Sequence, residues 1–310
     1  MNLLFDDDLV EAAVLRVAAT ADPAVPALQR ARFYAERERC YHVLDPDARN
    51  AVFARVHLDW FREWGLAARL EAGAAPFPHL TQTLAALAFR KARHRGDEGA
   101  ELYGDAEGQR RGVVALRPER VVEPAALAPF LHHELAHLAD MLDPAFGYSP
   151  DLGGAAVSPA QLRLVTERYR LLWAVSIDGR LIRRGLAAPA DEAQRRAEFD
   201  RAFGFLPAAR RTELFADLWS GRIARHAALL EVATDPRGLH DRHAPVPGAP
   251  CPLCGFAAFA WMTADHLSAA ARARIHAEFP GWTESEALCA RCAEVYEAVT
   301  RQNYPATVCL

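Results

Sequence analysis

The sequence predicts a mainly helical α+β fold with a small antiparallel sheet and a C-terminal module built around four cysteines. Three observations lead to this prediction. Amphipathic helical patterns occupy most of the chain, short β-prone segments are confined to residues 84–122, and two Cys-x-x-Cys pairs lie near the C-terminus. We therefore expect an N-terminal helical region at 1–80, a central domain at 81–235 and a cysteine module at 236–310.

The N-terminal region is predicted to be helical to about residue 75. Within it, Asp47–Leu70 carries apolar residues amid Arg, Glu and His at spacings close to a helical period. Two prolines, Pro76 and Pro78, end the region.

Short antiparallel strands joined by hairpins are predicted between residues 84 and 122. Glycine-rich turns at 95–99 and 104–108 separate the β-prone segments. The predicted strands are Leu84–Ala92, Glu101–Tyr103 and Gly112–Arg117, and a helix over Leu84–Arg93 is the alternative for the first.

A helix from Pro129 to Leu142 is predicted next, because Pro129 suits a first turn and Asp143-Pro144 stops it. A long loop rich in Gly, Pro and Ser follows at Ala145–Pro159, and loops of this length are often functional. The remaining predicted elements are helices at Ser158–Ser176, Asp191–Phe203 and Ala208–Ala233, a turn at Ile177–Arg180 and a linker at Asp235–Pro250.

The helix at 129–142 carries His133-Glu134-Leu135-Ala136-His137, an H-E-x-x-H pattern. Histidines four residues apart share one helix face, so both imidazoles can reach one metal ion. Glu134 then lies where it can take a proton from a metal-bound water. The pattern indicates a catalytic zinc with His133 and His137 as ligands and Glu134 as general base. The alternative is that both histidines are ordinary polar residues of a half-buried helix, and His132, on another face, has no expected metal role.

A catalytic zinc needs three protein ligands and one open position, so a third ligand is required. We expect it to be Glu213, which lies on a predicted helix with Asp217 four residues later on the same face. Asp217 would orient a zinc-binding histidine through its second ring nitrogen. One alternative is that Glu213 is a solvated helix residue without a metal role. Asp140, one turn after His137, is a rival third ligand, and its own alternative is a hydrogen bond to a neighbour near the helix end.

His133-Glu134-x-x-His137 followed by Glu213-x-x-x-Asp217 resembles the gluzincin metallopeptidases of the thermolysin-like clan. The two segments are also similar to the catalytic domain of anthrax lethal factor and its relatives. The resemblance covers these segments and the preceding strand. It implies a zincin-like domain, the ligand set His133, His137 and Glu213, and Gly112–Arg117 as the edge strand on which substrate backbone is laid. The separation between His137 and Glu213 is longer than in thermolysin.

A hydrogen-bond donor for the oxyanion of peptide hydrolysis is also expected. The candidates are Tyr148, Tyr169 and His226, and a structural role is the alternative for each.

Four of the six cysteines form Cys-x-x-Cys pairs, and Cys40 and Cys309 stand alone. In a chain without an export signal, such pairs indicate metal binding before disulfides or redox chemistry. The string from Cys251 to Gly255 is typical of a zinc knuckle, and the second pair opens a predicted helix. We expect a four-thiolate structural zinc in a treble-clef or zinc-ribbon-like module, although the spacing between the pairs exceeds that of usual ribbons. The expected ligands are Cys251, Cys254, Cys289 and Cys292.

The overall composition narrows the function. A net charge of −4 gives no reason to expect nucleic acid or an anionic membrane as partner, and no glycine-rich phosphate loop supports a kinase, ATPase or dehydrogenase. Residues 1–8 lack a secretory signal pattern, and no apolar stretch is long enough to cross a bilayer, so we expect a cytoplasmic protein.

The expected function is a zinc-dependent peptidase with a peptide or protein substrate and two zinc ions, one catalytic and one structural. The cysteine module is a candidate contact for a protein partner. One alternative is a non-catalytic zinc-binding interaction protein. The other is a protease recruited to DNA, because zinc modules beside H-E-x-x-H domains also occur in proteins of the SprT/Spartan type. The acidic balance argues against DNA.

Overall fold

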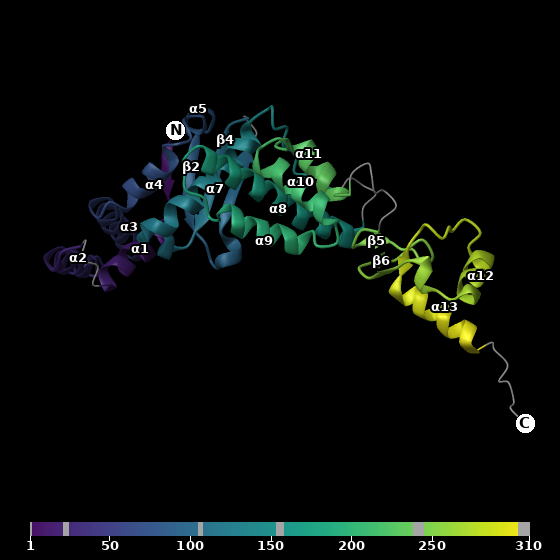
Figure 1. The fold of residues 1–310 in the computed structure, drawn as a ribbon. Coiled ribbons are helices and arrows are strands. Elements are labelled where there is room, and N and C mark those ends of the chain that lie inside the picture. The colour runs from purple at the N-terminus through teal and green to yellow at the C-terminus, as the bar shows by residue number, and fades with distance from the viewer. Residues whose placement is uncertain (1, 21–24, 105–107, 153–157, 238–244, 303–310) are drawn as a thin grey trace, which may run out of the picture. The chain divides into compact units, whose positions relative to one another are not determined.

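The computed structural model describes residues 2–20, 25–104, 108–152, 158–237 and 245–302. They form a mainly helical α+β fold, as predicted (Figure 1). The helices are α1 (Asp7–Ala19), α2 (Ala27–Cys40), α3 (Pro46–Glu63), α4 (Leu66–Ala74), α5 (Pro78–Thr83), α6 (Pro118–Val122), α7 (Pro124–Leu142), α8 (Pro159–Arg183), α9 (Glu192–Ala202), α10 (Ala208–Trp219), α11 (His226–Thr234), α12 (Ala269–Glu278) and α13 (Ala290–Gln302). The strands are β1 (Asn2–Phe5), β2 (Ala86–Lys91), β3 (Gly99–Gly104), β4 (Arg110–Leu116), β5 (Ala249–Pro250), β6 (Ala257–Ala258), β7 (Trp261–Met262) and β8 (Leu288–Cys289).

The chain divides into two compact units. The first contains residues 1–148 and 176–193, and the second contains residues 149–175 and 194–310. The N-terminal helices belong with the sheet because α1 packs on β2 and α6, and α4 packs on α7. The division of the chain into domains at 1–80, 81–235 and 236–310 stays a prediction. The two compact units combine parts of these ranges.

A four-stranded sheet in the order β1-β2-β4-β3 forms the frame of the first unit. The three predicted strands are present, and β3 and β4 form the expected antiparallel hairpin. The all-antiparallel arrangement was wrong: β2 runs parallel to both β4 and β1. Apolar β2 and β4 are mostly buried and take central positions, whereas the more exposed β3 takes the edge. The prediction that Gly112–Arg117 is an edge strand was therefore wrong.

Helix α7 begins at Pro124, more than one turn before the predicted start, and keeps Pro129 in its interior. Pro124 suits a first turn because it has no N–H to satisfy there. Its neighbours pack closely: a Cβ added at Gly112 of β4 would lie 3.0 Å from Leu87 and 3.1 Å from Leu138 of α7. The missing side chain at Gly112 lets α7 approach the sheet, which places the H-E-x-x-H residues beside β3.

Several predicted helices have different limits in the structure. The helix predicted at Asp47–Leu70 is two helices, α3 and α4, which meet at Gly65 in a left-handed conformation with φ of +70°. The turn predicted at Ile177–Arg180 was wrong, because α8 continues to Arg183. The helix predicted at Ala208–Ala233 is divided into α10 and α11. Parts of the predicted loop at 145–159 and linker at 235–250 lie outside the described residues.

The C-terminal cysteine module has a small core of its own. Leu253, Leu267, Ile275, Trp282 and Leu288 are buried together, and Trp261, Phe279 and Tyr296 pack against them. The segment between the two cysteine pairs supplies much of this core through α12, whose first turn is capped by Ser268. The long spacing between the pairs is thus occupied by a folded helix of the module.

Candidate metal centres

His133 and His137 lie one turn apart on α7, with their Nε2 atoms 3.2 Å apart. His133 is 8% exposed and His137 is partly buried. Nitrogens bound about 2.0–2.1 Å from one tetrahedral zinc lie about 3.3 Å from each other. The two imidazoles therefore have the separation of two ligands that share a zinc ion.

Asp178 fixes the orientation of His133. Its carboxylate, on α8, is completely buried and lies 2.6 Å from His133 Nδ1. A carboxylate only accepts, so His133 Nδ1 carries the proton and Nε2 presents its lone pair. This is the arrangement that supports a metal-binding histidine in many proteins. Sequence reasoning missed Asp178 because the dipeptide Asp178-Gly179 is typical of a turn. The signal that could have found it is an aspartate directly after the apolar run from Leu171 to Ile177.

Glu134 is directed to the edge of the sheet. Its Oε2 accepts a hydrogen bond of 2.9 Å from the backbone N–H of Ala100 on β3. Since Ala100 N–H points away from β4, alternate residues of β3, Ala100, Leu102 and Gly104, present their backbone groups to the outer edge. Burial raises the pKa of Glu134 above its ordinary value, and the Ala100 bond opposes that rise.

Charged side chains lie around the start of β3. The side chain of Glu98 is 4% exposed and accepts hydrogen bonds from Arg120 at 2.6 and 3.1 Å and from the backbone N–H of Arg117 at 3.2 Å. Burial acts to raise the pKa of Glu98, but the bonds from Arg120 and Arg117 outweigh it and lower this pKa below its ordinary value. Arg120 also stacks over Phe130 of α7 at 4.5 Å from the ring centre. These contacts fix the edge strand against the helix that carries Glu134.

Asp140 is held by an arginine. Its two carboxylate oxygens lie 2.8 and 2.5 Å from the Nη atoms of Arg180 on α8. This bidentate pair matches the alternative in which Asp140 bonds a neighbour near the end of α7.

Glu213 and Asp217 lie on α10, in the second unit. The Glu213 side chain is 65% exposed and pairs with Arg210 at 3.3 Å. Asp217 pairs with Arg222. Among the described residues, the cysteines alone form a cluster of three or more potential ligands. The roles of Glu213 as third ligand and Asp217 as its partner stay predictions, while the carboxylate that orients His133 is Asp178.

Two of the three oxyanion candidates bond to each other. The hydroxyl of Tyr169 on α8 lies 2.7 Å from Nδ1 of His226 at the start of α11, and both residues are buried in the second unit. Burial lowers the pKa of His226, which favours its neutral form. Tyr148, in the first unit, has a pKa raised by burial, so its hydroxyl keeps its proton. The oxyanion roles of all three stay predictions.

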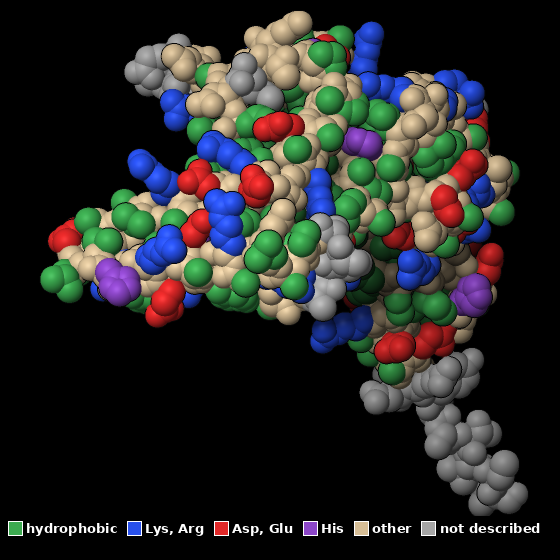
Figure 2. All heavy atoms as spheres, turned by 90° about the vertical axis from the view of Figure 1, so that its left-hand side faces the viewer, with side chains coloured by type: hydrophobic (Ala, Val, Ile, Leu, Met, Phe, Trp, Pro, Cys, Tyr) green, Lys and Arg blue, Asp and Glu red, His purple; other side chains and the backbone are tan. Residues whose placement is uncertain are grey.

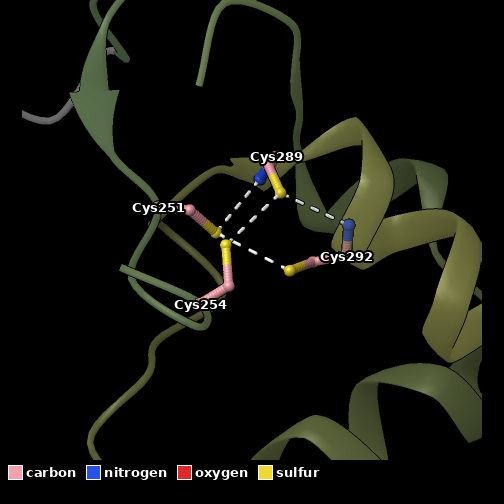
Figure 3. A group of neighbouring side chains, drawn as sticks. All are labelled: Cys251, Cys254, Cys289 and Cys292. Atoms are coloured by element: carbon pink, nitrogen blue, oxygen red, sulfur yellow. Dashed lines mark hydrogen bonds between the residues drawn. The ribbon is translucent and has the colours of Figure 1, made fainter. Parts of the chain in front are cut away.

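The four cysteines of the C-terminal module converge, as predicted (Figure 3). All four Sγ atoms lie within 4.8 Å of one another, with Cys251 and Cys292 4.0 Å apart and Cys254 and Cys289 3.9 Å apart. Sulfurs about 2.3 Å from a tetrahedral zinc are about 3.8 Å from each other. The cluster therefore fits a tetrahedral metal ion bound by four thiolates.

Local backbone geometry builds this cluster. The first pair sits in a turn in which Gly255 N–H donates to Cys251 O at 2.8 Å, and Gly255 has φ of +72°. The second pair begins α13, where Cys292 N–H donates to Cys289 Sγ at 3.3 Å. Cys289 N–H donates to Cys251 Sγ at 3.4 Å. Burial acts to raise the pKa of Cys251, but backbone donors led by Cys289 outweigh it and lower this pKa to about 7.

The two thiols of the second pair differ from Cys251 in the direction of their pKa shifts. Burial raises the pKa of Cys289 and Cys292, and the neighbouring sulfurs add to the rise for Cys292. A cation bound among the sulfurs would favour the thiolate forms of Cys289 and Cys292. All cysteines in the described ranges are free of disulfides, including buried Cys40. Cys309 lies outside the described residues.

Comparisons with protein-family models, with curated proteins and with solved structures return no match. The case for each centre therefore depends on the residues themselves. In the described residues no helix has both the length and the apolar character of a membrane span.

Proposed function

We propose that this protein is a zinc-dependent metallopeptidase that hydrolyses peptide bonds. The observation that carries the proposal is the pair of converging nitrogens of His133 and His137, with the buried carboxylate of Asp178 behind one of them. Glu134, between the two histidines in sequence, faces an exposed strand edge. Two metal ligands, an orienting carboxylate and an adjacent base are parts that metal-assisted hydrolysis requires.

His133 and His137 would hold the zinc through Nε2, and Glu213 is the proposed third ligand. When bound, a zinc ion supplies a Lewis acid that acidifies water and polarises a carbonyl group. Glu134 would take a proton from the attacking water and pass it to the leaving amine. One oxygen of Glu134 is held by Ala100 N–H, which leaves the other oxygen available for that proton.

The substrate class follows from the strand beside Glu134. Strand β3 is an edge, and an extended peptide can add to an edge through backbone hydrogen bonds that do not depend on its sequence. The substrate-binding strand that the resemblance places at Gly112–Arg117 is therefore transferred in our proposal to Gly99–Gly104. A peptide there would compete with Glu134 for the N–H of Ala100, which would release the carboxylate next to the bound backbone.

The finer fold assignments are part of the same proposal. A zincin-like arrangement is supported by the helix that carries the motif lying beside an edge strand. A treble-clef-like arrangement is supported by a knuckle inside the β5–β6 hairpin, followed by the β7–β8 pair and helix α13. One cysteine pair lies in the hairpin and the other at the start of the helix. We assign zinc to the four-thiolate cluster because a tetrahedron of four sulfur ligands suits a zinc ion. We assign the protein to the cytoplasm because a reducing compartment keeps thiols free, as the described cysteines are.

A second candidate is a non-catalytic zinc-binding interaction protein. It is favoured by one observation: within the described part of the chain, the four-cysteine cluster is the metal site whose ligands are all in place. In that case the module would contribute folding energy and a contact surface for a protein partner, and His133 and His137 would be a buried polar pair.

A protease recruited to DNA has less support. On the face shown in Figure 2, Lys and Arg side chains alternate with Asp and Glu and gather into no basic patch. Neutralising many phosphates requires clustered cations, and this face offers no such cluster.

Zinc per chain, measured by elemental analysis on wild type, Glu213→Ala and Glu134→Gln, tests the proposal. We expect two zinc ions in wild type and in Glu134→Gln, and one in Glu213→Ala. Cleavage of casein by wild type and its loss in Glu134→Gln would complete the assignment. One zinc in wild type would refute the peptidase and support the interaction protein. Two zinc ions in Glu213→Ala would remove Glu213 as ligand and leave the catalytic site to another third ligand.

A further inference from the structure

Arg168 is a charged residue buried in the second unit. It lies on α8 and is 5% exposed. Its Nη atoms donate to the backbone oxygens of Ala233 at 3.5 Å and Pro247 at 3.2 Å, and its guanidinium lies 5.2 Å from the ring centre of Phe205. An arginine has five N–H donors, so these bonds leave others available. Burial lowers the pKa of Arg168 to about 10.

No ion pair joins Arg168 to any residue that the structure describes. The negative charge of Asp235 opposes the fall in the pKa of Arg168. Both oxygens of Asp235 are engaged by Arg237, at 2.7 and 2.9 Å. Burying a charge is unfavourable unless the charge is paired, and for that reason buried charges are rarely left with carbonyl partners alone.

Arg168 lines a cavity of about 480 Å³. The volume falls in the range of small-molecule sites, which are mostly apolar with a few polar groups. Leu164, Val165 and Leu230 supply apolar lining, and Asp151 and Arg237 are the other charged lining residues within the described ranges. All of these residues belong to the second unit.

We propose that this cavity binds a small carboxylate with an apolar body, and that the carboxylate pairs with Arg168. The guanidinium is held in place by two carbonyls and by Phe205, so it needs little reorganisation to bind. Its planar donors match the two oxygens of a carboxylate. The apolar lining would accept the remainder of the molecule, which excludes a bare inorganic anion as the preferred ligand. Two sources share this chemistry: a free organic acid and the C-terminus of a short peptide.

The test is calorimetric titration of the full chain with matched acids and amides. The probes are 4-phenylbutyrate and its amide, N-acetyl-Leu-Phe and its amide, and inorganic phosphate. The variants are Arg168→Gln and, as matched control, Arg170→Gln, which removes an exposed arginine from the same helix and does not line the cavity. Leu230→Trp fills the cavity and leaves Arg168 in place.

We expect at least one acid to bind wild type and Arg170→Gln roughly tenfold or more tightly than its amide. Arg168→Gln should lose this preference, and Leu230→Trp should lose binding. The acid that binds more tightly identifies the source. If Arg168→Gln fails to fold, the proposal is judged by two results: the preference of wild type for the acid over its amide, and the loss of acid binding in Leu230→Trp. Equal binding of acid and amide, binding of phosphate alone, no acid binding up to roughly 10 mM, or unchanged acid binding in Leu230→Trp would overturn the proposal.

Discussion

Substituting Asp178 by Asn tests whether the histidine pair is a metal site. Asn keeps the volume of the side chain and an acceptor oxygen, and removes the negative charge 2.6 Å from His133 Nδ1. Removing such a partner lowers metal affinity by about 10–100-fold, or about 1.4–2.7 kcal/mol. Because Asp178 is 0% exposed, no water screens its charge, and we expect a loss near the upper limit.

The assay is zinc retention against increasing concentrations of a chelator, with the four-cysteine site as internal reference. The matched control is Asp217→Asn, since Asp217 is the carboxylate that sequence reasoning assigned to the same task and it pairs with Arg222. We expect Asp178→Asn to release the zinc bound by His133 and His137, the second zinc, at a lower chelator concentration than wild type. The zinc of the four-cysteine site should be unaffected. If Asp178→Asn retained the second zinc as wild type does, or if Asp217→Asn lost it, the reasoning from the 2.6 Å contact would be refuted.

Four further predictions follow from the same structure. Glu134→Gln should keep two zinc ions and lose casein hydrolysis by at least about a hundredfold, measured as a rate, and an active variant would exclude it as the base. Cys254→Ser should hold one zinc fewer than wild type, and trypsin should cleave it first within residues 245–302. If these residues resisted trypsin as they do in wild type, a structural role for the zinc would be contradicted. Glu98→Gln should reduce the free energy of unfolding near neutral pH. Because the folded-state pKa of Glu98 is lowered, its contribution is present above the unfolded pKa and is lost as pH falls through the folded value, so urea titrations should show the two proteins converging below about pH 4. Gly112→Ala should cost about 1–3 kcal/mol in the same titration at neutral pH, because its Cβ would crowd β2 and α7, and an unchanged midpoint would show that the packing can adjust.

The parts of the fold that could be predicted from sequence depend on neighbouring residues. The positions of His133 and His137 on one face follow from helical periodicity, and the cysteine pairs follow from turn geometry. The three β-prone segments were found because glycine-rich turns separate them.

The parts that could not be predicted depend on contacts between distant segments. Strand β1 pairs with β2 across more than 80 residues, so local patterns did not indicate a parallel sheet. Asp178 faces His133 only because α8 continues through Gly179, where tertiary packing outweighs the low helical preference of glycine. The long segment between the cysteine pairs could not be assigned to the core of its own module until Ile275 and Trp282 were seen to be buried there.

The hydrogen bond from Ala100 to Glu134 also bears on solubility. An unpaired edge strand is a template for association with other chains, and proteins commonly protect such edges with charges or by occupying their donors. Glu134 occupies an outward N–H of β3, and the exposed side chain of Glu101 adds a negative charge to the same strand. The carboxylate that we propose for proton transfer would thus also limit self-association, so that one residue would link chemistry to resistance against aggregation.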